Sequence, residues 1–146
     1  MIVIPKPPVS RYKSDYKLCA LKIRNPIPQP DLLLQDYNKK YLIEDIQAVL
    51  NVEAPISKEL LCRRVLAAWS MVRIGSRIEA WFDVIFAQMD IKHTDKGTRF
   101  FWKTNQLPEN YALYRISNND ADKRDAPDIP PEEISNAIRE IFGEPD

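Results

Sequence analysis

The sequence predicts a mainly helical α+β fold with three helices, a short β-hairpin and a last helix near the C-terminus. Three observations lead to this prediction. Apolar residues recur at intervals of three and four in three successive segments between residues 39 and 89. Two short extended runs then flank a turn containing Asp95, Lys96 and Gly97. A further amphipathic segment follows an acidic loop, and 146 residues with 45% hydrophobic content suffice for one compact domain with extensions.

Residues 1–38 are predicted to form a proline-rich linker or an extended arm. They contain six of the twelve prolines, which interrupt both helices and sheets. Between the prolines, YKLCALKI (residues 16–23) is apolar enough to form a strand against the following domain or a neighbouring one. MIVIPKPPVSR lacks the long apolar region of a signal peptide, and no segment approaches eighteen apolar residues. We therefore expect a cytoplasmic protein.

The three core helices have recognisable start and stop signals. The first spans residues 39–50 and ends before Pro55, which disfavours helical conformation in the preceding residue. Ser57 is a good N-cap for the second helix, which ends near Ser70. Directly after Gly75, Ser76 and Glu79 have the spacing of a capping box for a third helix, whose apolar stripe runs from residue 78 to residue 89.

This order of elements is that of a winged-helix domain, a relative of the helix-turn-helix fold. The predicted domain therefore covers residues 39–103, with a two-stranded wing made by the hairpin. Residues 104–146 form an acidic loop and a C-terminal helix over residues 130–142, which begins with prolines and glutamates and ends at Gly143. We expect this segment to pack on the domain.

Charge is balanced over the whole chain, yet it is unevenly distributed. Lys plus Arg and Asp plus Glu number 21 each, so no global field attracts a polyanion or a membrane. Residues 57–103 hold nine bases and five acids, a net charge of +4, while residues 104–146 hold four bases and ten acids. Because phosphate neutralisation dominates affinity for nucleic acids, the basic part predicts contacts with a DNA backbone. The residues predicted to make them are Arg63, Arg64, Arg73, Ser76, Arg77, Lys96 and Arg99.

A second interpretation stays open, because the third helix is poorly equipped to read bases. Of its outward positions only Arg77 and Gln88 are good base readers, and Asp83 would repel phosphate. Winged-helix domains also dock onto proteins, so the alternative prediction is a docking module for neighbouring ATPase or nuclease domains. No catalytic motif is present, and Cys19, Cys62 and the lone His93 do not make a metal site. We expect no enzyme activity, cofactor or metal.

Several short motifs resemble a known family. They are E-x-P-I at residues 53–56, the Arg pair at 63–64, R-x-G-S-R-I at 73–78 and P-x-E-I at 131–134. Over about residues 40–142 the chain resembles the C-terminal domain of unknown function of large bacterial superfamily 1 helicase-like proteins. The resemblance implies an appendage that follows an ATPase and a restriction-endonuclease-like nuclease domain, with the proline-rich arm as the tether. It carries over no active-site residue.

Overall fold

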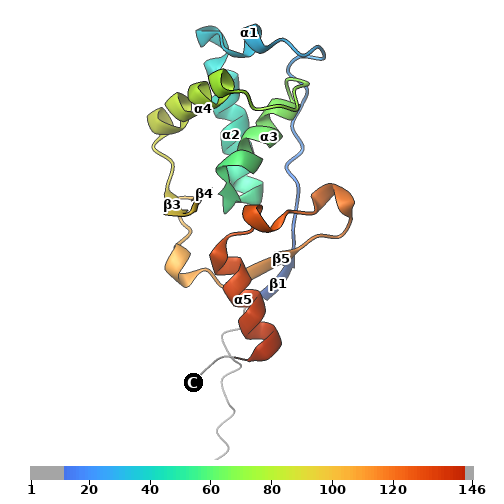
Figure 1. The fold of residues 1–146 in the computed structure, drawn as a ribbon, viewed down its shortest axis with the longest axis vertical. Helices are drawn as coiled ribbons and strands as arrows, with labels where there is room; N and C mark the ends of the chain where they lie inside the picture. The colour runs from blue at the N-terminus through green and yellow to red at the C-terminus, as the bar shows by residue number, and fades with distance from the viewer. Residues whose placement is uncertain (1–11, 144–146) are drawn as a thin grey trace, which may run out of the picture.

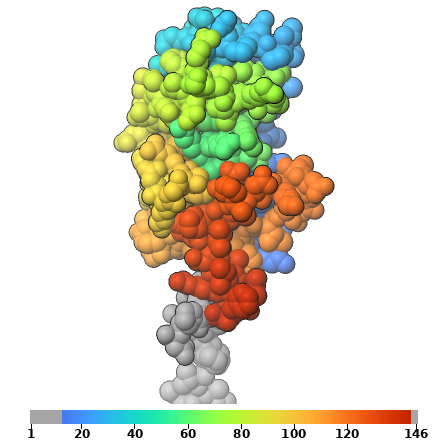
Figure 2. All heavy atoms as spheres, in the orientation of Figure 1, coloured from blue at the N-terminus to red at the C-terminus, as the bar shows by residue number. Residues whose placement is uncertain are grey.

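The computed structural model describes residues 12–143 and has an α+β architecture (Figure 1). Three helices form one end of the molecule: α2 (Lys39–Glu53), α3 (Lys58–Ala67) and α4 (Ser76–Met89). A small sheet lies beneath them, and α5 (Pro131–Phe142) lies at the opposite end (Figures 1 and 2). None of the helices in residues 12–143 combines the length and the apolar character needed to cross a membrane.

The helical end has one continuous apolar core, which confirms the predicted helices. Each helix buries one stripe because its apolar residues recur at the helical period. The fully buried side chains of this stripe include Leu42, Ile46 and Val49 of α2, Leu61 and Val65 of α3, and Phe82 and Ile85 of α4. The predicted N-cap of α3 is also confirmed, since the Ser57 hydroxyl accepts a hydrogen bond of 3.1 Å from the Leu60 amide.

The predicted hairpin is present and is part of a three-stranded antiparallel sheet. Strands β3 (His93–Lys96) and β4 (Thr98–Phe101) meet at Gly97, whose φ of 83° favours glycine. A strand that we did not predict, β2 (Ile56–Ser57), pairs with β4, so the strand order is β2-β4-β3. The two residues between Pro55 and α3 were too few to give a strand pattern of their own.

The predicted capping box at the start of α4 is wrong. Gly75 is the N-cap, no side chain caps the helix, and Ser76 already lies inside it. The Glu79 carboxylate accepts a hydrogen bond from Lys58 Nζ instead of reaching back to the helix start. Glu79 pairs with Lys58 on the neighbouring helix α3. The spacing of Ser76 and Glu79 in the sequence could not predict this competing contact.

The arm lies extended along the domain (Figure 1), and the strand predicted at residues 16–23 is wrong. The strand is β1 (Tyr12–Asp15), which pairs in parallel with β5 (Leu113–Ile116). After it, Tyr16 is buried as a single side chain, and a short helix α1 (Pro30–Leu33) inserts Leu33 into the core. Cys19 and Leu21 pack against the core as single side chains, while Leu18 and Ile23 are exposed.

The C-terminal segment forms a second layer around β5. Helix α5 lies against β5, and its Glu133 and Asn136 face inward. The start of α5 at Pro131, directly after Pro130, and its end before Gly143 match the predicted signals. Residues 1–11 and 144–146, including the apolar start of the chain, lie outside the described residues.

Candidate nucleic-acid interface

The seven predicted contact residues lie on three separate parts of the structure. Arg63 and Arg64 are on α3, and Lys96 and Arg99 are on the hairpin. The remaining three surround the start of α4, with Arg73 in the preceding loop and Ser76 and Arg77 in the first turn. The fold therefore does not gather all seven into one patch.

The N-terminus of α4 is the best-formed part of this surface. Gly75 precedes it in extended conformation and has no side chain to accept hydrogen bonds from the first amides. The side chains of Arg73, Ser76 and Arg77 are exposed around it. Arg77 makes a solvent-exposed ion pair of 3.3 Å with Asp31, and Arg73 has no ion pair among residues 12–143. Free amides, the positive end of a helix dipole and two guanidinium groups form a site suited to an anion.

The two hairpin cations point to different sides of the sheet. Arg99 pairs with Asp95 through contacts of 2.9 and 3.3 Å, and this hydrogen bonding lowers the pKa of the Asp95 carboxyl. Lys96 pairs at 3.3 Å with Glu132 at the start of α5. Lys96 lies opposite Thr98 in the ladder, and Arg99 is the next residue along β4, so the alternation of side chains places Lys96 and Arg99 on opposite faces. Only Arg99 lies on the α4 side, beside the groove that Asp83 and Asp90 also line.

The exposed face of α4 beyond its first turn carries acids as well as bases. Lys58 Nζ lies 3.3 Å from Glu79 and 2.6 Å from Asp83, so this cation is neutralised by α4 itself. The carboxylates raise the pKa of Lys58 against the opposing effect of burial. A polyanion would meet a surface of mixed charge here.

Arg64 is held inside the protein, unlike its neighbour Arg63. Its Nε lies 3.0 and 3.2 Å from the two carboxylate oxygens of Glu53, a side chain with no exposed area. Arg63 is exposed and pairs with Glu59 one turn earlier, at 2.6 Å. The predicted assignment of both arginines to one phosphate surface does not suit Arg64, because moving it would leave the Glu53 charge buried without its cation.

The Glu53 carboxylate also binds the arm. It accepts hydrogen bonds from the Tyr16 hydroxyl at 2.5 Å and from the Cys19 amide at 3.1 Å. Burial and the neighbouring Glu53 charge raise the pKa of Tyr16, which keeps the phenol protonated and able to donate. The sequence contains no sign of this cluster, since its members come from three distant segments.

A second buried carboxylate, Glu133, organises the C-terminal layer. Arg115 donates to it from its backbone amide and its side chain, at 2.8 to 3.0 Å, and Arg124 Nη1 does so at 2.6 Å. Burial alone would raise the pKa of Glu133, but these hydrogen bonds outweigh it and lower the pKa. Both guanidinium groups also stack on the ring of Tyr16, at 4.9 and 4.2 Å. These clusters hold the layers together.

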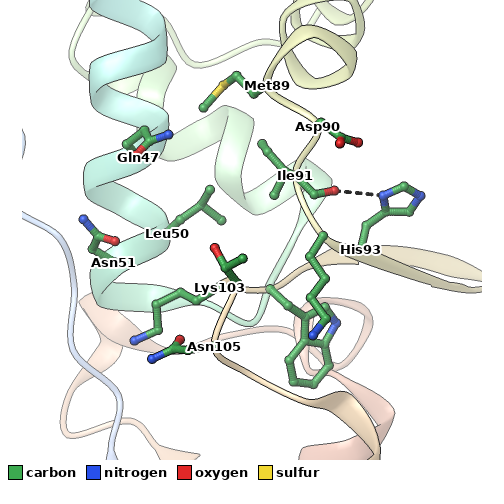
Figure 3. Close-up of a pocket in the computed structure, with 12 residues that line it drawn as sticks. Gln47, Leu50, Asn51, Met89, Asp90, Ile91, His93, Lys103 and Asn105 are labelled. Atoms are coloured by element: carbon green, nitrogen blue, oxygen red, sulfur yellow. Dashed lines mark hydrogen bonds between the residues drawn. The ribbon is translucent and has the colours of Figure 1, made fainter.

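A groove of about 930 Å³ separates α2 from the segment that follows α4 (Figure 3). Gln47 and Asn51 line one wall, and Asp90, His93 and Lys103 lie across from them. The His93 ring is directed to the Ile91 carbonyl, at 3.1 Å, and away from the α2 wall (Figure 3). Within residues 12–143 no three His, Cys, Asp or Glu side chains are grouped as metal ligands would be. The groove offers neutral amides and scattered charges.

Comparison with known proteins finds similarity in one segment. Residues 31–80 match a family described as a protein of unknown function, DUF3320. No curated protein and no solved structure matches the chain. The matched segment runs from α1 into the second turn of α4, and it includes Arg63, Arg64, Arg73, Ser76 and Arg77 while leaving out the hairpin. Residues 31–80 of this chain are thus similar to a domain family of unknown function.

Proposed function

We propose that this chain is a non-catalytic nucleic-acid-binding module that holds a DNA phosphate at the N-terminus of α4. The observation that carries the proposal is the uncapped start of α4 between the exposed side chains of Arg73 and Arg77. The α4 amides can donate to phosphate oxygens while the guanidinium groups supply charge. Ser76 adds a hydroxyl at the same place.

The topology supports a winged-helix interpretation of the fold. The elements follow in the order helix, strand, helix, helix and hairpin, and the strand before α3 joins β4. In a winged helix this order places α4 as the recognition helix and β3–β4 as the wing. Arg99 on the α4 side of the hairpin would then give a second, weaker backbone contact, whereas Lys96 is directed to α5.

The resemblance to the C-terminal domain of bacterial helicase-like proteins supports a role within a larger DNA-processing protein. In that context the module would position substrate, and ATP hydrolysis and cleavage would belong to other domains. Arg64 has no place in the contact surface under this proposal, because it neutralises Glu53.

Titration with labelled duplex and single-stranded DNA at about 50 and 200 mM salt tests the proposal. We expect binding that weakens steeply with salt. In Arg73→Ala/Arg77→Ala the slope of the logarithm of the binding constant against the logarithm of the salt concentration should be smaller in magnitude by about two. A matched control is Lys17→Ala/Arg139→Ala, which removes two exposed charges elsewhere and leaves the slope nearly unchanged. Absence of binding at the lower salt concentration, or an equal loss in the control, would contradict the proposal.

A second function is favoured by one observation at the same loop. Val72, next to Arg73, is 87% exposed, which suits a protein contact better than a phosphate contact. The chain would then dock onto an ATPase or nuclease domain of the same protein. Val72→Ser separates the two functions, because it removes the apolar side chain without adding a charge beside Arg73. It should abolish docking and leave the salt dependence of DNA binding in place.

A further inference from the structure

A small pocket lies at the α1 end of the molecule (Figure 1), where the arm meets the beginning of α2. Its volume is about 410 Å³. Pockets for small ligands occupy roughly 300–1,000 Å³. Three of its lining residues are aromatic, namely Tyr37, Tyr41 and Trp69. Aromatic rings favour a ligand that is itself flat, because two rings can then stack on each other.

Tyr37 is the accessible ring of this pocket. It is 63% exposed, and within residues 12–143 its hydroxyl makes no hydrogen bond and no cation lies over its ring. The ring of Tyr41 differs, since the Arg24 guanidinium and the Lys40 ammonium each lie 5.0 Å from its centroid. The pocket therefore has one ring that is free to stack on a ligand and one that already binds cations.

The buried residues of the pocket supply groups for hydrogen bonding. Trp69 is only 4% exposed, and its Nε1 has no acceptor among residues 12–143. Buried donors without a partner are uncommon in folded proteins, and an acceptor atom of a ligand would satisfy this one. Asn38 Nδ2 donates to the Leu32 carbonyl at 2.8 Å, which leaves Asn38 Oδ1 as an acceptor. A nucleobase is a flat ring with donors and acceptors on its edge, so it matches both properties of the pocket.

The pocket continues towards the N-terminus of α4. Leu32 and Tyr37 also line a second hollow of about 560 Å³, which extends to Asp31. Asp31 in turn lies 3.3 Å from Arg77 in the first turn of α4, and both side chains of this pair are highly exposed. Exposed pairs contribute little to stability, so a phosphate can replace Asp31 beside Arg77 at small cost. A strand that fills both hollows would run from Tyr37 to the start of α4.

We propose that the pocket holds an unpaired base of a single-stranded nucleic acid, stacked on Tyr37, while a phosphate of the same strand binds at the N-terminus of α4. This inference rests on the proposed function and names its substrate class. In a duplex the bases are stacked and paired, so they cannot enter a pocket without first leaving the helix. Stacking on an aromatic side chain accepts any base, and we therefore expect little sequence preference.

Two labelled DNA strands of equal length, one with bases and one abasic, test the pocket by fluorescence anisotropy with the full chain. Both strands carry the same phosphates, so a difference in affinity comes from the bases. We expect the strand with bases to bind about tenfold more tightly. Tyr37→Ala should remove this difference, whereas Tyr37→Phe should keep it because the ring remains. Phe142→Ala removes an exposed ring from α5 and is the matched control, with no expected effect.

Equal affinity of the wild-type protein for the two strands would overturn the inference, as would a loss in Tyr37→Ala no larger than in Phe142→Ala. Equal affinity is also the result expected if the pocket receives a side chain of a partner protein. Failure of the proposed function alone looks different. The preference for the strand with bases would then remain, but binding would not depend on salt or on Arg73 and Arg77. Absence of binding to either strand at about 50 mM salt would overturn both.

Discussion

The Tyr16 hydroxyl donates a hydrogen bond of 2.5 Å to Oε1 of Glu53, which lies 37 residues later in the chain. Glu53 ends α2, and Tyr16 follows β1 directly, so this contact joins the arm to the helical core. Arg64 shares the same carboxylate from α3. The arm is therefore a structural part of the domain, and it is attached at the Glu53 carboxylate, which is fully buried.

Replacing Tyr16 with phenylalanine tests this attachment. We expect the free energy of unfolding to fall by about 2 kcal/mol, because a buried carboxylate loses one donor while the ring stays in place. Urea denaturation measures the change. Tyr37→Phe is a matched control, since Tyr37 is exposed and has no side-chain hydrogen bond among residues 12–143; its effect should stay within about 0.5 kcal/mol.

The adjacent arginines of α3 should differ sharply in their effect on stability. Arg64→Ala leaves the Glu53 charge buried without a cation, and we expect a loss of roughly 3–5 kcal/mol. Arg63→Ala removes only an exposed pair with Glu59, which contributes about 0.3–0.5 kcal/mol. Chemical denaturation of both variants checks the difference. Similar losses in the two variants would refute the role assigned to Glu53.

Glu133 should make the protein sensitive to acid. Its folded-state pKa lies below the ordinary value of 4.5, so its stabilising contribution is complete above that pH. The contribution is lost as the pH falls through the lower, folded-state pKa. Glu133→Gln should cost roughly 3–5 kcal/mol at neutral pH and reduce the pH dependence in the acid range. Unfolding curves from about pH 7 to pH 3, with the exposed Glu109→Gln as control, measure both effects.

The two cysteines should react differently with thiol reagents. Burial raises the pKa of the Cys62 thiol to about 12, so almost no thiolate is present at neutral or mildly alkaline pH. Cys19 is partly exposed, although burial raises its pKa as well. In the folded protein we expect Ellman's reagent to modify Cys19 slowly and Cys62 not at all. Rapid modification of Cys62 before the protein is unfolded in guanidinium chloride would contradict its burial.

Much of the helical core could be predicted because its signals are local. The period of the apolar residues located α2, α3 and α4, and Ser57 marked the start of α3 through its own hydrogen bond. The turn at Gly97 was equally local. The capping box at Ser76 failed because Glu79 had a competing partner, Lys58, on another helix. Strand β1 was misplaced because its partner β5 lies about a hundred residues away.

The candidate interface could be only partly predicted, for an electrostatic reason. Sequence identifies every cation, but it does not show which ones are already paired. Arg64 pairs with Glu53, Lys96 with Glu132 and Arg99 with Asp95, whereas Arg77 pairs only with the highly exposed Asp31. What singles out the start of α4 is the missing cap together with the exposed arginines beside it, and both depend on how the loop enters the helix.

By itself, the sequence determined where the helices and the hairpin form, because these depend on periodicity and on turn residues within a few positions of one another. Only the tertiary structure decided that the arm is bound to the core, that Arg64 and Arg115 are internal, and that one face of α5 is open. The first two of these facts follow from which charges meet in the folded protein. A buried carboxylate must find its cation in space, wherever that cation stands along the chain.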